Sequence, residues 1–269
     1  MRHCGLMKLA LLLAPALLAT ALLAQDSITP TKKIVLFNGK NLDGWYTWLR
    51  ETKYEDPKKV FTVTGGQIHV TGEDWGGVAT KRAYRDYHLI VEWRWGGKTL
   101  PPRVKNARDS GILIHAVGED GKYNSTWLES IESQIIEGGV GDIILVGGQN
   151  KPSLTVNTVQ DGRELYWKQD GKPVTKDSGR FNWYGRSRLW KDAIDYRGVE
   201  DVEAPMGKWN RQEIFAQGDK ITYVVNGKVV IHGYNSSHRA GKIQLQSEGA
   251  EIYFRRVELR PIKKMPKLN

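Results

Sequence analysis

Hydrophobic residues recur along this chain in short runs that suit β-strands and show no sustained helical period. The runs are rich in Val, Ile, Tyr, Phe and Trp, and polar or glycine-containing segments separate them. The predicted strands are Ile34–Phe37, Val60–Thr64, Gln67–Val70, Tyr87–Trp95, Gly111–Ala116, Ser130–Ile136, Ile143–Val146, Leu154–Gln160, Trp209–Phe215, Ile221–Val225, Val229–His232, Lys242–Gln246 and Ile252–Leu259. This pattern predicts an all-β fold.

Turn signals fall between the predicted strands. They are Asn38-Gly39, Gly65-Gly66, Asp120-Gly121, Asp161-Gly162, Asp170-Gly171 and Asn226-Gly227, which supply the positive φ of tight reversals. The clearest hairpin spans Ile221 to Ile231. Strands at this spacing predict one β-sandwich or jelly roll of two antiparallel sheets. The long segment from Phe181 to Pro205 predicts a functional loop or a cover over one sheet face.

The first 24 residues read as a secretory signal peptide. Arg2 and Lys8 precede an apolar run from Leu9 to Leu23, and Ala24 gives a small residue before a polar segment. The alternative is an uncleaved anchor, but the run is interrupted by Pro15 and is short for a bilayer span, which needs roughly 20 residues. We therefore expect export to the periplasm or the medium, followed by a single domain over residues 25–269.

The cysteine content indicates how the domain is stabilised, and the charge distribution indicates which classes of binding partner are expected. Cys4 is the only cysteine and falls in the predicted signal peptide, so the domain is expected to be held by its core. Loss of the signal peptide leaves 38 Lys plus Arg against 30 Asp plus Glu, a net charge of +8. These basic residues are scattered apart from the tail at 263–267, so no nucleic-acid partner is expected. No later run predicts stable membrane insertion, and no pattern predicts an oligomeric state.

The segment Glu132-Ser133-Gln134-Ile135-Ile136-Glu137 places acid-base groups inside a β-forming run. In a regular strand Glu132 and Gln134 share one face while Glu137 lies on the other. A β-bulge between Gln134 and Glu137 would bring all three polar side chains to a common face, and bulges are frequent beside active sites. The segment therefore predicts a polar ligand site on a concave sheet face, with a solvated strand face as the alternative.

Aromatic residues are abundant in the predicted loops. Trp45, Trp48, Trp75, Trp127, Trp183 and Trp190 lie in or beside them. Flat rings stack on the apolar faces of sugars, so this pattern indicates a carbohydrate ligand. We expect about two of these side chains, with Trp127 and Trp183 as candidates, to contact the ligand and the others to pack beneath their loops.

A series of ordered motifs resembles the 3-keto-disaccharide hydrolase family. These motifs are Leu36-Phe37-Asn38-Gly39-Lys40-Asn41-Leu42-Asp43-Gly44-Trp45; Ala79-Thr80-Lys81 with Glu92-Trp93; Ser110-Gly111-Ile112; Glu132-x-Gln134; Gly207-Lys208-Trp209-Asn210; Asn226-Gly227-Lys228; and Gly241-Lys242-Ile243-Gln244-Leu245-Gln246. The resemblance covers nearly all of the mature chain. It implies a concanavalin A-like β-sandwich, export, and action on glycosides whose glucose unit is oxidised at C3. Two departures are Glu137, where the family usually has Asp, and Ser247-Glu248, where a His is frequent.

Cleavage of a 3-keto-glucoside requires a base, a second acid-base group and residues that bind the sugar. A ketone at C3 acidifies the C2 proton, so a base can form an enolate that expels the group at C1, and hydration of the product completes a net hydrolysis. We expect His115 or Glu132 as the base, although a structural role for His115 is the alternative. Glu137 or Glu248 would be the second acid-base group. Lys81, Gln134 and Gln246 would bind the ketone or hydroxyls.

The sequence leaves three alternatives open. A divalent cation such as Ca²⁺, Mg²⁺ or Mn²⁺ would stabilise the enolate, although no recognised ligand spacing is present. A retaining glycosidase of laminarinase type would use Glu132 and Glu137 as a carboxylate pair. A non-catalytic carbohydrate-binding module would use the same aromatic and polar residues for binding alone. In each case the partner is an oligosaccharide or glycoside.

Overall fold

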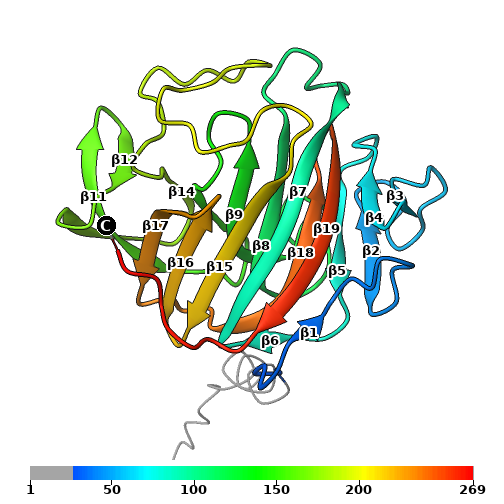
Figure 1. The fold of residues 1–269 in the computed structure, drawn as a ribbon, viewed down its shortest axis with the longest axis horizontal. Coiled ribbons are helices and arrows are strands. Elements are labelled where there is room, and N and C mark those ends of the chain that lie inside the picture. The colour runs from blue at the N-terminus through cyan, green and yellow to red at the C-terminus, as the bar shows by residue number, and fades with distance from the viewer. Residues whose placement is uncertain (1–26, 269) are drawn as a thin grey trace, which may run out of the picture.

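The protein is a sandwich of two antiparallel β-sheets in a computed structural model that describes residues 27–268. The two sheets lie one in front of the other in Figure 1. The predicted signal peptide, residues 1–24, lies outside the described residues. No helix long and apolar enough to cross a membrane occurs within residues 27–268.

The larger sheet forms the front layer of Figure 1. Its strand order is β12 (Glu164–Trp167), β11 (Leu154–Asp161), β17 (Lys228–Tyr234), β16 (Lys220–Val225), β15 (Asn210–Gln217), β7 (Tyr87–Thr99), β19 (Ala250–Arg260), β4 (Gln67–Val70) and β3 (Phe61–Thr64). Two further strands pair with interior strands of this order: β1 (Ile34–Val35) pairs with β19, and β13 (Lys172–Lys176) pairs with β11.

The smaller sheet lies behind the larger one. Its order is β14 (Gly179–Phe181), β10 (Ile143–Val146), β9 (Glu129–Ile136), β8 (Asp109–Val117), β18 (Ala240–Ser247), β5 (Gly76–Thr80) and β2 (Trp45–Leu49), with β6 (Tyr84–Arg85) paired to β18. Strands far apart in the sequence are therefore neighbours, and β8, β9 and β18 bring three sequence motifs side by side.

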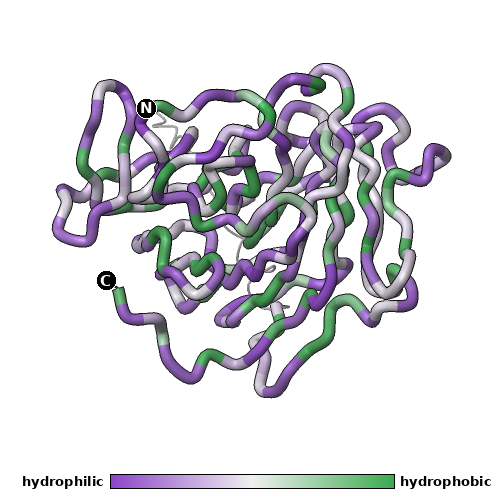
Figure 2. Tube along the Cα trace, turned by 45° about the horizontal axis from the view of Figure 1, so that its top comes forward, coloured by the Kyte–Doolittle hydropathy of each residue, from purple (hydrophilic) through white to green (hydrophobic). Residues whose placement is uncertain are grey.

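The core fills the space between the two sheets. Leu89, Val91 and Trp93 project from β7, while Ile112 and Ile114 project from β8, and all five are fully buried in one hydrophobic cluster. Hydrophobic and hydrophilic positions alternate along many strands, and the loops at the rim are mainly hydrophilic (Figure 2). Alternate residues of a strand point to opposite faces, so the polar residues between core positions of the smaller sheet face away from the core.

The prediction of an all-β sandwich is confirmed, and so is the hairpin at Asn226-Gly227. β16 and β17 pair in antiparallel fashion, and both turn residues have positive φ, 49° at Asn226 and 85° at Gly227. Such values suit Asn-Gly in a tight reversal. The strands β2, β5, β6, β12, β13 and β14 were not predicted, because their sequences are short or rich in Gly, Lys or Trp.

The predicted bulge between Gln134 and Glu137 is wrong. β9 keeps a regular register with β8, from Ile131 opposite Ile114 to Ile136 opposite Asp109. The irregularity lies instead in β8, where one extra residue is inserted between Ile114 and Val117. His115 sits at this bulge with a φ of 50°. A bulge needs an extra residue in one strand of a pair, and local sequence does not say which strand carries it.

Candidate active site

One group of buried polar side chains lies on the face of the smaller sheet that points away from the core, called the site face here. Ile131 and Ile135 of β9 point into the core, so Glu132 and Gln134 point to the site face. By the same alternation, β8 places Asp109 and Gly111 on that face. Gln244 and Gln246 join them from β18, whose Ile243 and Leu245 belong to the core.

Gly111 opens a space at the centre of this group. A Cβ at this position would lie 2.2 Å from Oε1 of Glu132 and 2.3 Å from Oε1 of Gln246, so both side chains lean over the glycine from neighbouring strands. Each of these oxygen atoms is buried without a hydrogen-bond partner in the described part of the chain, and so is Oδ1 of Asp109. Buried polar atoms are normally paired, so two unpaired oxygens at one glycine and a third on the same sheet face indicate a ligand site.

The carboxyl groups of this cluster are strongly perturbed. Burial, with the charge of Asp109 second, raises the pKa of Glu132 to about 8, and the positive charge of Arg180 opposes this shift. Burial also raises the pKa of Asp109, to about 6, against the lowering effect of Arg103 and Arg180. Arg103 forms an ion pair of 3.3 Å with Asp109. At neutral pH the cluster therefore contains an ionised Asp109 and a protonated Glu132.

Glu248 extends the cluster beyond the end of β18. Its pKa lies well above the ordinary value because of burial and the charges of Asp109 and Glu132, again opposed by the two arginines. Ionising all three neighbouring carboxyl groups is costly, because their negative charges repel one another. Asp109, Glu132 and Glu248 therefore titrate as a coupled group and not independently. The predicted residues Glu132, Gln246 and Glu248 are thus brought together with Asp109.

Aromatic side chains close one side of the site face. Trp127 packs with Leu113 and Val146 on this face, and Trp75 lies against it with ring centroids 5.9 Å apart. The indole N–H of Trp127 donates to the carbonyl of Gly76. Trp127 therefore lies at the site but is largely buried, with 6% of its surface exposed. Trp183, in contrast, belongs to the core cluster and is 1% exposed, away from solvent.

The structure does not bring His115 to Glu132. Its ring makes an edge contact with Tyr87 of the larger sheet, at a centroid distance of 5.6 Å, and Nδ1 is 2.9 Å from the carbonyl oxygen of His238. Tyr87 is a fully buried core residue, so the imidazole lies between the sheets. Burial lowers the pKa of His115 to about 4, which keeps it neutral at physiological pH. This environment is that of a structural histidine.

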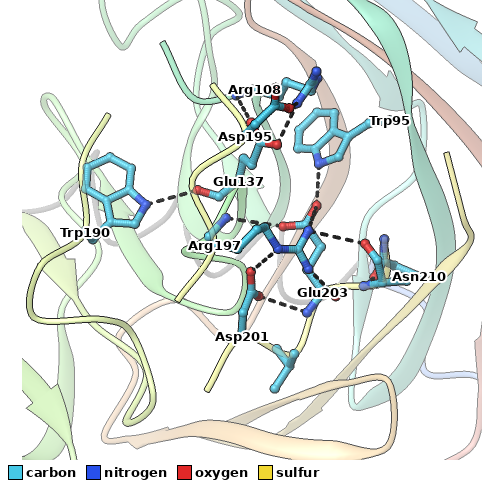
Figure 3. A network of polar contacts seen from close by, with 12 residues as sticks. Trp95, Arg108, Glu137, Trp190, Asp195, Arg197, Asp201, Glu203 and Asn210 are labelled. Atoms are coloured by element: carbon cyan, nitrogen blue, oxygen red, sulfur yellow. Dashed lines mark hydrogen bonds and ion pairs between the residues drawn. The ribbon is translucent and has the colours of Figure 1, made fainter. Parts of the chain in front are cut away.

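Glu137 also lies outside the cluster, because it follows the end of β9. Its Oε1 is 2.6 Å from a guanidinium nitrogen of Arg108, and its main-chain carbonyl accepts from the indole of Trp190 (Figure 3). The Glu137 and Arg108 side chains are 4% and 6% exposed. Arg108 pairs in addition with Asp195 at 3.0 Å. Glu137 therefore fastens the segment after β14 to the smaller sheet.

A second network fastens the same segment at Glu203 (Figure 3). Its carboxylate accepts from the Trp95 indole at 2.7 Å and from the Gly138 N–H at 3.3 Å, and Arg197 lies 3.4 Å away. The prediction that residues 181–205 form a functional loop or cover corresponds to the long segment between β14 and β15, which runs over the top of the sandwich in Figure 1. These contacts hold it in a defined position.

The two other predicted binding residues, Gln134 and Lys81, form no side-chain hydrogen bond or ion pair with the carboxyl cluster within residues 27–268. Gln134 uses its side-chain oxygen to accept from the N–H of Ile135, and its own N–H donates to the carbonyl of Asp142. Lys81 is exposed just after β5, and its N–H donates to the carbonyl of Gly44. Both follow the alternation of the site face, but Lys81 lies at the opposite end of β5 from Gly76 and its neighbour Trp75.

Asp109, Arg103 and Arg180 were missed in the sequence. Asp109 stands two residues before Gly111, which belongs to a recognised motif, so strand alternation would have placed it on the same face. No comparable signal marks Arg180, because β14 was not predicted. Among residues 27–268, no group of three or more His, Cys, Asp or Glu side chains is arranged to hold a metal ion. A divalent cation such as Ca²⁺, Mg²⁺ or Mn²⁺ stays an open alternative.

The fold and the site define an antiparallel β-sandwich protein with a cluster of buried acid-base groups on one sheet face. The sequence pattern of the 3-keto-alpha-glucoside-1,2-lyase-like domain matches residues 32–260. The chain belongs to this family. The family match confirms the resemblance seen in the ordered motifs.

Solved structures of similar fold are distant in sequence. A candidate glycosyl hydrolase from Parabacteroides distasonis is 18% identical, with 86% of this chain and 94% of that chain covered and a TM-score of 0.50. A β-glucanase from Bacillus licheniformis is 11% identical over 87% and 99% of the two chains, with a TM-score of 0.43. The carbohydrate-binding module CBM66 from Bacillus subtilis is 12% identical over 80% and 94%, with a TM-score of 0.44. No protein of curated function matches the chain in sequence.

Proposed function

We propose that this protein is an exported enzyme that cleaves 3-keto-glucosides by elimination, followed by hydration. The observation that carries this proposal is the group of three unpaired buried oxygens on the site face, those of Glu132 and Gln246 at Gly111 and that of Asp109 on the same strand as Gly111. Two of them belong to carboxyl groups whose pKa values differ, about 6 for Asp109 and about 8 for Glu132. Two carboxyls held apart in pKa are suited to act as a base and an acid at the same pH.

The elimination begins at C2 of the oxidised sugar. Ionised Asp109 takes the C2 proton, and the electron pair of the C–H bond passes into the enolate of the C3 ketone. When the enolate collapses, a C1–C2 double bond forms and the C1–O bond breaks. Glu132 gives its proton to the departing oxygen, so the leaving group is released as a neutral alcohol. Asp109 is then protonated and Glu132 ionised.

Hydration restores both groups. The oxygen of a water molecule adds to C1 while ionised Glu132 takes a proton from that water. Protonated Asp109 returns its proton to C2. The sum of both steps is hydrolysis to the 3-keto sugar and the free alcohol. Gln246 lies across Gly111 from Glu132 and is suited to bond a sugar hydroxyl, while the positive charge of Arg180 favours the enolate. This scheme moves the base from His115 or Glu132 to Asp109.

The geometry is less suited to a laminarinase-type double displacement. That mechanism needs two facing carboxylates about 5 Å apart, whereas Glu137 lies beyond the end of β9 in an ion pair with Arg108. A carbohydrate-binding module would use the same face to bind a glycan without cleaving it. A protein that binds the substrate but does not cleave it would establish this alternative.

The deciding experiment compares a 3-keto-glucoside with its unoxidised parent and follows release of the aglycone. Release from the keto substrate alone, reduced at least 100-fold in both Asp109→Asn and Glu132→Gln, is expected. Release from the parent would favour an ordinary glycosidase, and binding without release would favour a binding module. A parallel reaction with EDTA tests the predicted divalent cation. The mass of the protein recovered outside the cytoplasm tests removal of residues 1–24.

A further inference from the structure

A cavity of about 300 Å³ lies at the β14 edge of the smaller sheet. Three arginines, Arg180, Arg186 and Arg188, line it together with the rings of Tyr166 and Trp190. Of these residues, Arg180 alone also takes part in the proposed elimination. Arginine forks beside aromatic walls are suited to hold a planar anionic group.

Arg180 joins the cavity to the carboxyl cluster. In the strand register, Ile144 of β10 stands opposite Glu132 on one side and opposite Arg180 on the other. Glu132 and Arg180 therefore lie in one row across the site face, two strand spacings or roughly 10 Å apart along the backbone. A leaving group that extends along this row from the sugar over Gly111 would enter the cavity.

The floor of the cavity carries more positive than negative charge. Arg180 and Arg186 both contact the same oxygen, Oδ2, of Asp142. The other oxygen of Asp142 accepts from the N–H of Trp183, and the side chain is fully buried. One carboxylate thus faces two guanidinium groups, and the charge of buried Asp109 acts on Arg180 in addition.

The remaining charges of the cavity lie toward solvent. Arg188 pairs at 3.0 Å with Asp161, and their side chains are 41% and 58% exposed. Glu164 is exposed, and its carboxylate accepts from the amide of Asn182. An exposed pair such as Arg188 and Asp161 contributes little and is easily exchanged. Arg188 also lies 3.2 Å over the ring of Tyr166, which holds its guanidinium at the wall of the cavity.

We propose that this cavity binds the carboxylate of an acidic leaving group, so that the preferred substrates are 3-keto-glucosides with an anionic aglycone or an acidic second sugar. This inference rests on the proposed function and adds the substrate class. Arg188 exchanges Asp161 for the carboxylate of the ligand, and the guanidinium groups of Arg180 and Arg186, which share the single carboxylate of Asp142, add attraction. The rings of Tyr166 and Trp190 contact the apolar part of the leaving group.

The test uses two 3-keto-glucosides that differ in one group. One carries a 3-(carboxymethyl)phenyl aglycone and the other a 3-(carbamoylmethyl)phenyl aglycone, so the methylene keeps the two phenols similar as leaving groups. We expect kcat/KM to favour the carboxylate by roughly tenfold at low salt and less at high salt. The ratio is expected to fall toward one in Arg188→Gln and to stay unchanged in Arg163→Gln, an exposed arginine of the β11–β12 turn.

Binding gives a readout that does not depend on turnover. Calorimetric titration of the two unoxidised glucosides into the full chain is expected to show the same carboxylate preference and the same loss in Arg188→Gln. Equal binding of the two compounds, or a preference that Arg188→Gln leaves intact, overturns the assignment. If neither keto compound is cleaved but the binding preference appears, the proposed reaction fails while the anionic subsite stands.

Discussion

Asp109 and Glu132 lie on neighbouring strands of one sheet face, and the charge of the first raises the pKa of the second. Burial raises the pKa of both carboxyl groups above the ordinary value, to about 6 for Asp109 and about 8 for Glu132. The order of the two values follows from their surroundings, because Asp109 has Arg103 at 3.3 Å whereas Oε1 of Glu132 has no partner among the described residues. Two chemically similar side chains are thereby prepared for opposite proton transfers.

The pH dependence of cleavage is expected to be bell-shaped. Activity requires Asp109 ionised and Glu132 protonated, so kcat/KM should rise with pH through about 6 and fall through about 8. The residual activity of Glu132→Gln should lack the alkaline limb, and that of Asp109→Asn the acid limb. Because the groups interact, each limb reports the cluster. A profile that keeps both limbs in Glu132→Gln would refute the assignment of the acid.

Gly111→Ala is expected to block the site without unfolding the protein. The added Cβ would lie 2.2 Å from Glu132 Oε1 and 2.3 Å from Gln246 Oε1, both ends of flexible side chains that would have to move out of place. We expect at least a 100-fold loss of kcat/KM, since small misplacements of reacting groups are costly. Gly97→Ala in β7 is the matched control, because its Cβ would meet nothing within 4 Å. Equal activity of the two variants would contradict the site.

Glu132→Gln is expected to stabilise the fold, and more so at high pH. The folded-state pKa of about 8 lies above the unfolded value near 4.5, so the wild type loses stability as pH rises through this interval. Gln does not titrate, and the difference in Tm should therefore grow between about pH 4.5 and 8 and then level off. Each 1 kcal/mol corresponds to roughly 2–4 °C for a domain of this size. A constant difference across that range would show that Glu132 is not perturbed in the folded state.

Glu137→Gln should affect stability rather than chemistry. It leaves the buried Arg108 without its closest charge partner, which costs about 3 kcal/mol or more for a buried pair. Denaturant unfolding measures this loss, and activity per folded molecule should stay within a few-fold of wild type. Glu119→Gln, which breaks an exposed contact with Lys122 of 3.5 Å, should cost less than about 1 kcal/mol. A large drop in kcat with unchanged stability would return Glu137 to the active site.

His115→Asn separates the structural role of this position from a catalytic one. Asn adopts positive φ more readily than most residues, so the bulge at 50° is preserved. We expect kcat/KM within tenfold of wild type and an unchanged pH profile. Loss of the acid limb in this variant would instead identify His115 as the base.

The predicted strands follow from alternation and turn chemistry, and both are local. β9 and the hairpin at Asn226-Gly227 were therefore predictable, since hydrophobic spacing and positive-φ residues carry the information. β14 was not, because its three residues, Gly179–Phe181, are ordered by pairing with β10 rather than by their own preferences. The bulge was expected in β9 but lies in β8, between Ile114 and Val117. Its position depends on how these two strands align, which the sequence of one strand does not show.

The site was predictable where one strand defines it. Glu132 stood out because it interrupts a hydrophobic strand, and Gln246 because a family motif contains it. Asp109 and Arg180 gain their significance from strands that are remote in sequence, and their effect on the pKa of Glu132 exists only in the assembled sheet. His115 and Glu137 have suitable chemistry, but burial and an ion pair commit them to the fold.

Glu203 joins the two sheets of the sandwich. One carboxylate links Trp95 of the larger sheet to Gly138, which follows β9 of the smaller one, and Arg197 and Asp201 brace it from the same segment. The segment between β14 and β15 is therefore joined to both sheets through one side chain. Its position depends on how the two sheets pack against each other, whereas the carboxyl cluster depends on the pairing within the smaller sheet alone.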